Sequence, residues 1–191
     1  MLSGIRAVPA VHSVQFYDRH EALIERLRGI VVSGLELGNS VLIVATAEHR
    51  HQLAHALEKF KSQVRDAEKE RRFLMCDAEE TLATFMVDNR PERDQFLYSL
   101  GKLFSEFDED RALTVFGDMV AVLWDAGNKV GALELEALWN DLLNRRVFHL
   151  HCAYPRGHVS NDEETGFAAI CHHHSHVIGH STGIRQPVKL A

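Results

Sequence analysis

Residues 114–143, TVFGDMVAVLWDAGNKVGALELEALWNDLL, contain the pattern that decides the fold. A short apolar strand over residues 112–116 ends at a Gly-Asp pair, and two helical segments separated by a Gly-Asn pair follow it. The second helical segment has one apolar face, made of Leu135, Leu138, Trp139 and Leu142. This order of a buried strand and amphipathic helices is typical of one unit of an α/β protein.

The remaining chain repeats the alternation of strands and helices. Residues 40–46, SVLIVAT, are almost wholly apolar and β-branched, as in a parallel strand that is covered on both faces. Further strands are predicted over residues 11–17, 72–76 and 147–153, and the last helix over residues 162–178. Strands that alternate with helices need crossover connections. The predicted fold is therefore α/β with three layers, a mostly parallel central sheet flanked by helices.

Length, charge and cysteine content restrict the class of protein. A chain of 191 residues can bury one substantial core, and its formal net charge of −6 disfavours direct binding of nucleic acid. Three cysteines form no CxxC pair, which indicates a reducing compartment. No stretch has the roughly 18 apolar residues of a membrane span. We therefore expect a cytoplasmic protein without a membrane partner.

Six segments, in chain order, resemble the MEDS family of sensory domains. They are HSVQFYD (12–18), GLELGNSVLIVATAEHRHQL (34–53), DAEETLATFMVDNRPERDQF (77–96), the stretch 114–143, CAYP (152–155) and ICHHHSHVI (170–178). Asp118 departs from the family pattern, which would place Glu in a GEMV-type motif. The resemblance predicts a single sensory domain over residues 11–180, with flexible termini at residues 1–10 and 181–191.

The resemblance also implies a fold and a function. It implies a fold similar to the RecA/KaiC-type ATPase core, used to sense small organic, hydrocarbon-like signals. Such domains usually lie beside a histidine kinase, an anti-sigma ATPase module or a DNA-binding domain. The prediction is a non-catalytic domain that binds a small organic ligand and relays the signal to a separate kinase, anti-sigma factor or transcriptional regulator. A second copy of the chain is a further expected partner, in a homodimer.

A RecA-like layout makes ATP hydrolysis the obvious enzymatic alternative. A phosphate-binding loop needs G-x-x-x-x-G-K-[ST] after its strand, so that backbone N–H groups and a lysine surround the phosphates. The chain instead reads Ala47-Glu48-His49-Arg50 after residues 40–46, where Glu48 would repel phosphate. Thr46 is better explained as the N-cap of a helix. The sequence therefore predicts no ATPase.

The candidate ligand-binding residues are His12, Tyr17, Asp118, Trp124, Cys152 and Tyr154. The motif resemblance singles out His12, Tyr17, Cys152 and Tyr154, and also His174. Asp118 follows a strand whose carboxyl end faces the crevice of an α/β sheet, although it could instead cap the next helix. The flat Trp124 ring suits an apolar signal or a place in the core, and Cys152 is open to the same core interpretation.

The histidines and cysteines suggest a second function, a metal- or redox-responsive regulator. It would use Cys152, Cys171 and the His172–His176 cluster, in which His172 and His176 share a face of the predicted last helix. His12, Cys152 and His174 form the predicted metal set, because imidazole and thiolate suit Zn²⁺. Solvated surface histidines are the alternative. A divalent metal is thus the one cofactor candidate. The least favoured interpretation is a nucleophilic Cys152, with His151 or His174 as the base and Asp118 as the residue that orients the base.

Overall fold

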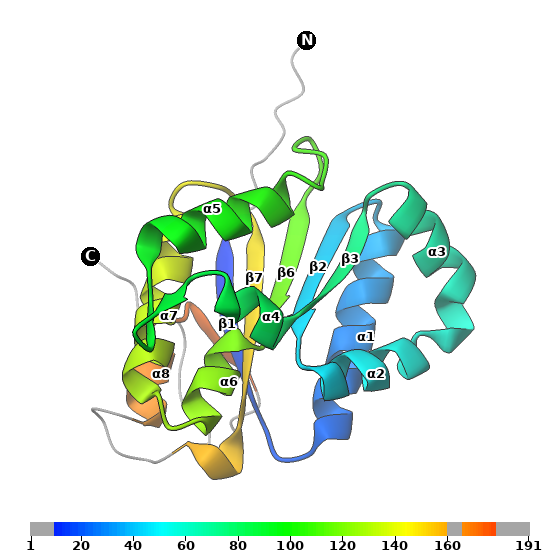
Figure 1. Cartoon of the computed structure of the whole chain (residues 1–191). Helices are drawn as coiled ribbons and strands as arrows, with labels where there is room; N and C mark the ends of the chain where they lie inside the picture. The colour runs from blue at the N-terminus through cyan, green and yellow to red at the C-terminus, as the bar shows by residue number, and fades with distance from the viewer. Residues whose placement is uncertain (1–9, 160–165, 179–191) are drawn as a thin grey trace.

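Six parallel strands form the central sheet of the computed structural model, which describes residues 10–159 and 166–178 (Figure 1). The strand order across the sheet is β3-β2-β6-β7-β1-β8. The strands are β1 (Val11–Tyr17), β2 (Ser40–Ala45), β3 (Phe73–Asp77), β6 (Leu113–Gly117), β7 (His149–Pro155) and β8 (His176–Ile178). The predicted three-layer α/β fold is confirmed, and the closer likeness to RecA and KaiC stays a prediction.

Helices cover both faces of the sheet. One face carries α1 (His20–Glu36), α2 (Ala47–Ala56) and α3 (Lys61–Lys69). The other carries α4 (Ala78–Ala83), α5 (Arg93–Phe104), α6 (Met119–Asp125), α7 (Lys129–Leu143) and α8 (Phe167–His172). No helix within the described ranges has the length and apolar character needed to cross a membrane.

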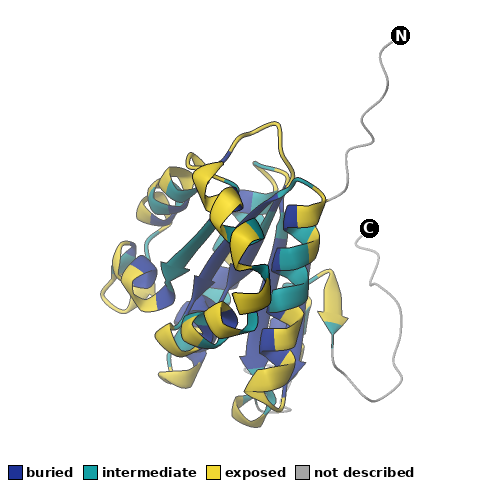
Figure 2. Ribbon diagram, turned by 90° about the vertical axis from the view of Figure 1, so that its right-hand side faces the viewer, coloured by how far each residue is buried: buried dark blue, intermediate teal, exposed yellow. Residues whose placement is uncertain are grey.

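The core is divided by the sheet into two apolar clusters. Alternate residues of a strand point to opposite faces, so Leu42 and Val44 pack under α4–α8 whereas Val41 and Ile43 pack under α1. All six residues of β2 are buried, which confirms a strand covered on both sides. Figure 2 shows the buried strands between helices whose outer faces are exposed.

The adjacent strands β2 and β6 send the chain to opposite faces of the sheet. β2 continues into α2 on one face, while β6 continues into α6 on the other. The segments that follow these two strands therefore diverge to opposite faces of the sheet. Such a switch point is the usual position of a ligand crevice in open α/β sheets.

The predicted last helix over residues 162–178 is wrong in its final part. α8 ends at His172, and β8 then joins the edge of the sheet beside β1. Ser175 starts this pairing, because its backbone N–H donates to the His12 carbonyl (2.8 Å) and its Oγ accepts from the His12 N–H (3.1 Å). His176 therefore lies on a strand and shares no helix face with His172.

The chain after β3 also differs from the prediction. The acidic start at Asp77 predicts a helix that runs to about residue 87, but α4 ends at Ala83, and the short strands β4 (Met86–Val87) and β5 (Arg90–Pro91) form an antiparallel pair. Asp88 and Asn89 make the turn between them with φ of 46° and 64°. Of the termini predicted to be flexible, all but residue 10 lie outside the described residues.

Asn128 is the N-cap of α7, and its replacement by alanine should destabilise the fold by about 1–2 kcal/mol. Its Oδ1 accepts from the Gly131 N–H (2.9 Å), and its Nδ2 donates to the Asn89 carbonyl (2.7 Å). Urea unfolding measures the change. Asn144→Ala at the exposed end of the same helix is the control, with an expected change under about 0.5 kcal/mol. Equal losses in both variants would contradict this role of Asn128.

Candidate functional site

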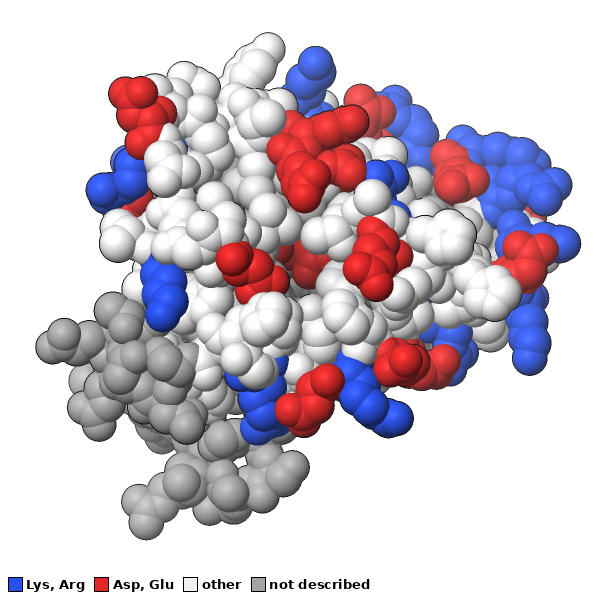
Figure 3. Space-filling view, turned by 60° about the horizontal axis from the view of Figure 1, so that its bottom comes forward, with Lys and Arg blue, Asp and Glu red and all other residues white. Residues whose placement is uncertain are grey.

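A crevice of about 540 Å³ lies at the carboxyl ends of β1, β2, β6 and β7, at the switch point of the sheet. Tyr17, Thr46, Asp118 and Pro155 enter its lining from these four strand ends. Figure 3 shows this end of the molecule, with acidic side chains in the middle of the face and basic ones mostly nearer its edge. The crevice is therefore the first candidate for a ligand site.

Asp118 anchors a chain of polar contacts at the base of the crevice. Its carboxylate is 1 % exposed, and Oδ2 accepts from the Thr46 backbone N–H (3.2 Å) and from His49 Nδ1 (2.5 Å). His49 Nε2 then lies 2.9 Å from His20 Nδ1. Asp118 Oδ1 has no hydrogen-bond partner among the described residues. Asp118 is the N-cap residue of α6, but its side chain makes no capping hydrogen bond, so the predicted bond to the first N–H groups of the helix is absent.

The electrostatics of the crevice follow from this buried carboxylate. Burial opposes the charged form of His49, but the hydrogen bond and charge of Asp118 outweigh burial and raise the pKa of His49. Burial and then Asp118 raise the pKa of Tyr17, so its hydroxyl stays neutral. Further carboxylates line the crevice, those of Asp18, Glu48, Glu79 and Asp125. The crevice thus favours ligands that donate hydrogen bonds and disfavours anions.

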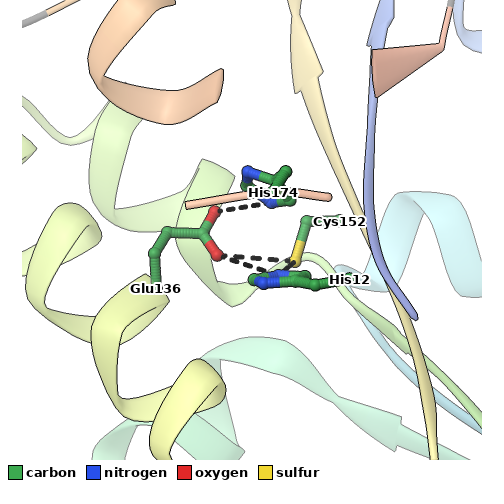
Figure 4. Close-up of side chains that lie close together, drawn as sticks. All are labelled: His12, Glu136, Cys152 and His174. Carbon is green, nitrogen blue, oxygen red and sulfur yellow. Dashed lines mark hydrogen bonds and ion pairs between the residues drawn. The ribbon is translucent and has the colours of Figure 1, made fainter. Parts of the chain in front are cut away.

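A second cluster of polar side chains lies under α7 on the face of the sheet that α4–α8 cover (Figure 4). His12 comes from β1, Glu136 from α7, Cys152 from β7, and His174 from the segment between α8 and β8. One ligand atom from each residue can be chosen so that all four lie within 4.8 Å of one another. All four side chains are shielded from solvent, and those of Glu136 and His174 are 0 % exposed.

Glu136 is the centre of this cluster. Its Oε2 lies 3.3 Å from His12 Nε2 and 3.8 Å from Cys152 Sγ. Its Oε1 accepts from the Tyr154 hydroxyl at 2.7 Å and lies 3.5 Å from His174 Nε2. Burial opposes ionisation of Glu136, but the two imidazoles and Tyr154 outweigh it and lower the pKa of this carboxyl to about 2. Burial lowers the pKa of His174 to about 4 and raises the pKa of Cys152.

The family model of the MEthanogen/methylotroph, DcmR Sensory domain (MEDS) matches residues 11–174 of this chain. The chain belongs to the MEDS family. A search of the curated proteins finds no match. The matched range contains all four residues of the buried cluster and the residues of the crevice named above. MEDS domains are sensory domains, which agrees with a sensory role for this chain.

The MEDS domain does not collect the predicted ligand-binding residues in one place. Tyr17 and Asp118 line the crevice, whereas His12, Cys152 and Tyr154 belong to the buried cluster. Trp124 is 2 % exposed and lines neither, because its ring packs edge-on against Tyr154 (centroids 5.7 Å apart). Its Nε1–H donates to the His158 carbonyl (2.8 Å), so Trp124 supports the wall of the crevice from behind.

The predicted metal set of His12, Cys152 and His174 comes together in the structure, and Glu136 joins it. The prediction that His172 and His176 share a face of the last helix is wrong. Both residues are exposed, and His176 lies on β8. Cys171 is half-buried on α8 and does not belong to the cluster. The proposed role of Asp118 as orienter of a Cys152 nucleophile is also wrong, because its carboxylate is bonded to His49.

Sequence reasoning missed three residues of these sites. Glu136 could have been found from the sequence, because it is an acidic residue that lies between Leu135 and Trp139 on the apolar face of the helix. In the structure it is 0 % exposed. His49 and His20 carry no comparable signal, because they follow different strands and meet only through the sheet order.

The His49–Asp118 pair predicts a pH dependence of stability. The pKa of His49 is higher in the folded than in the unfolded chain, so the pair stabilises the fold below the ordinary value of 6.5. This contribution disappears as the pH rises through the raised pKa. We expect the stability difference between wild type and His49→Gln, measured by urea unfolding, to narrow above neutral pH. A difference that grows with pH would contradict the assignment.

Proposed function

We propose that this MEDS domain is a non-catalytic sensor that binds a small organic molecule in the crevice at the strand ends. The single observation that supports this proposal most is the orphaned oxygen of Asp118. Asp118 lines the crevice, and its buried Oδ1 has no hydrogen-bond partner in the described parts of the chain. An unpaired buried carboxylate oxygen is costly, and a ligand that donates a hydrogen bond there would remove the cost.

The walls of the crevice restrict the chemistry of this ligand. A donor group, such as a hydroxyl or an ammonium, would pair with Asp118 Oδ1. Ala121, Val122 and Pro155 add apolar surface for a short hydrocarbon part. The surrounding carboxylates repel phosphates and carboxylates. The preferred ligand is therefore a small alcohol or amine with a hydrocarbon body.

The same residues argue against nucleotide hydrolysis. Thr46 caps α2 by accepting from the His49 N–H, and Glu48 stands in the first turn of this helix. Arg50, the nearest cation on α2, is paired with Asp77 (2.5 Å). No group at this turn is placed to neutralise a triphosphate. We therefore propose that the domain has no ATPase activity.

Transmission of the signal would begin at the hydrogen bond between the two residues that precede α2 and α6, the helices that flank the crevice. Asp118, which precedes α6, accepts from the backbone N–H of Thr46, which precedes α2. A ligand that bonds Asp118 changes this link, and α6 packs directly on α7 at the surface. The signal would pass to a separate protein, such as a histidine kinase, an anti-sigma factor or a DNA-binding regulator. A second copy of this chain is the alternative partner.

A thermal-shift screen of untagged protein tests the proposal. Ligands that bind only the folded state raise the melting temperature. We expect a rise with small alcohols or amines, a smaller one or none with halogenated one-carbon compounds that lack a hydrogen-bond donor, and none with ATP and Mg²⁺. A rise with ATP and Mg²⁺ alone would overturn the proposal.

Asp118→Asn then identifies the site of any organic ligand. Loss of a charged hydrogen bond should weaken binding by about 10–100-fold. Asp66→Asn, which removes an exposed carboxylate on α3, is the matched control and should leave binding unchanged. Equal weakening by both variants would place the ligand elsewhere.

A further inference from the structure

The buried cluster under α7 presents an excess of hydrogen-bond acceptors. The His12 ring donates through Nδ1, because the Asn140 Oδ1 it contacts at 2.9 Å belongs to an amide whose Nδ2 donates to the His173 carbonyl (3.0 Å). His174 donates through Nδ1 to the Ile170 carbonyl (2.7 Å). In both rings Nε2 therefore faces the Glu136 carboxylate.

The polar atoms of the cluster are not all satisfied by hydrogen bonds. His174 Nε2 is buried and has no hydrogen-bond partner among the described residues, although it lies 3.5 Å from Glu136 Oε1. The Tyr154 hydroxyl already donates to that oxygen, and the Cys152 thiol is a weak donor. A cation bound between His174 Nε2 and Glu136 Oε1 would satisfy both atoms.

We propose that His12, Glu136, Cys152 and His174 form a closed tetrahedral site for a divalent transition metal ion, with Zn²⁺ as the best fit. This site is separate from the crevice and does not depend on the ligand proposed for it. The four residues offer two imidazoles, one thiolate and one carboxylate, the ligand types that zinc prefers. Mg²⁺ and Ca²⁺ take oxygen ligands and would not select this set.

The distances agree with tetrahedral coordination. Metal–ligand bonds of about 2.0–2.3 Å give a tetrahedron whose edges are about 3.3–3.7 Å. The distances from His12 Nε2 are 3.3 Å to Glu136 Oε2 and 3.6 Å to Cys152 Sγ. Small side-chain shifts would therefore complete the coordination, since all four ligand atoms already lie within 4.8 Å.

Charge and outer contacts favour the same occupant. A thiolate and a carboxylate together neutralise a divalent cation, which removes the cost of burying net charge. Each histidine also donates its other ring N–H to an oxygen, the arrangement that fixes ligating imidazoles around metals. The ion would join β1, β7 and α7 to the segment that leads into β8.

A cysteine nucleophile is the competing interpretation of the same atoms. Cys152, His12 and Asn140 are arranged as in a Cys-His-Asn triad. Cys152 is, however, 0 % exposed, and burial followed by the charge of Glu136 raises the pKa of its thiol. A substrate could not reach this sulfur, whereas a bound metal ion would favour its thiolate form.

Cobalt substitution of the chelator-treated, untagged full chain tests the proposal, because Co²⁺ reports its ligands by absorption. We expect one Co²⁺ per chain, strong visible bands of four-coordinate cobalt, a thiolate-to-cobalt charge-transfer band, and displacement by Zn²⁺. The weak spectrum of six-coordinate cobalt, or the absence of the charge-transfer band in wild type, would overturn the proposal without recourse to any variant.

Variants identify the ligands. Cys152→Ser should abolish the charge-transfer band, and Cys76→Ser, a half-buried cysteine on β3 at the far edge of the sheet, should retain it. Asn140→Ala leaves all four ligands in place and should weaken metal binding by about 10–100-fold through His12. A band that persists in Cys152→Ser, or unchanged affinity in a folded Asn140→Ala, would contradict the assignment.

Discussion

Replacing Glu136 by alanine is expected to lower the free energy of unfolding by about 3–5 kcal/mol, measured by urea unfolding with a chelator present. The carboxylate is 0 % exposed and accepts from the Tyr154 hydroxyl at 2.7 Å. Without it, this hydroxyl loses its partner in the core and the two imidazoles face an empty space. The chelator excludes any contribution from metal binding.

Glu134→Ala is the matched control for Glu136. Glu134 lies on the same helix, two residues earlier, but it is partly exposed and pairs with Arg90 at the surface. Such a surface pair contributes at most about 1 kcal/mol. A loss in Glu136→Ala no larger than in Glu134→Ala would show that the buried carboxylate does not organise the cluster.

Trp139→Ala should cost about 3–5 kcal/mol by the same unfolding measurement. The Trp139 ring is fully buried and packs edge-on against Phe96 (centroids 5.2 Å apart) and Phe148 (6.3 Å). Alanine would leave a large cavity between α5, α7 and the loop before β7. The loss would come from packing alone, because Trp139 Nε1 has no hydrogen-bond partner within the described chain.

Trp139→Phe provides the control for this interpretation. It removes the unpaired Nε1–H together with part of the ring and keeps an aromatic contact with Phe96. We expect less than half of the loss seen with alanine. Equal losses in the two variants would mean that the indole nitrogen has a polar role that the packing account omits.

The sequence predicted the layers of the fold because each layer has a local signal. The apolar run of β2 and the Leu-Trp face of α7 identify a buried strand and a packed helix without knowledge of their neighbours. β8 carries no such signal. It is three residues long, largely exposed, and becomes a strand only because Ser175 and His176 meet β1.

The candidate sites could be predicted only in part because they depend on contacts across the sheet. His12 pairs in register with Leu150, two residues before Cys152, so both side chains point to the face under α7. This register is not visible in the sequence, and neither is the sheet order that brings His49 to Asp118. The motif resemblance supplied His12 and Cys152, but not the separation of the crevice from the buried cluster.

The most direct test of the sensory account is an amide NMR titration of isotope-labelled protein with the organic compound that stabilises it most. We predict that the largest shift changes occur at Thr46, whose N–H is bonded to Asp118, and at other crevice residues such as Ala121 and Gly157. Changes centred instead on the hollow beside Leu74 and Leu103, or no changes at Thr46, would contradict binding in the crevice.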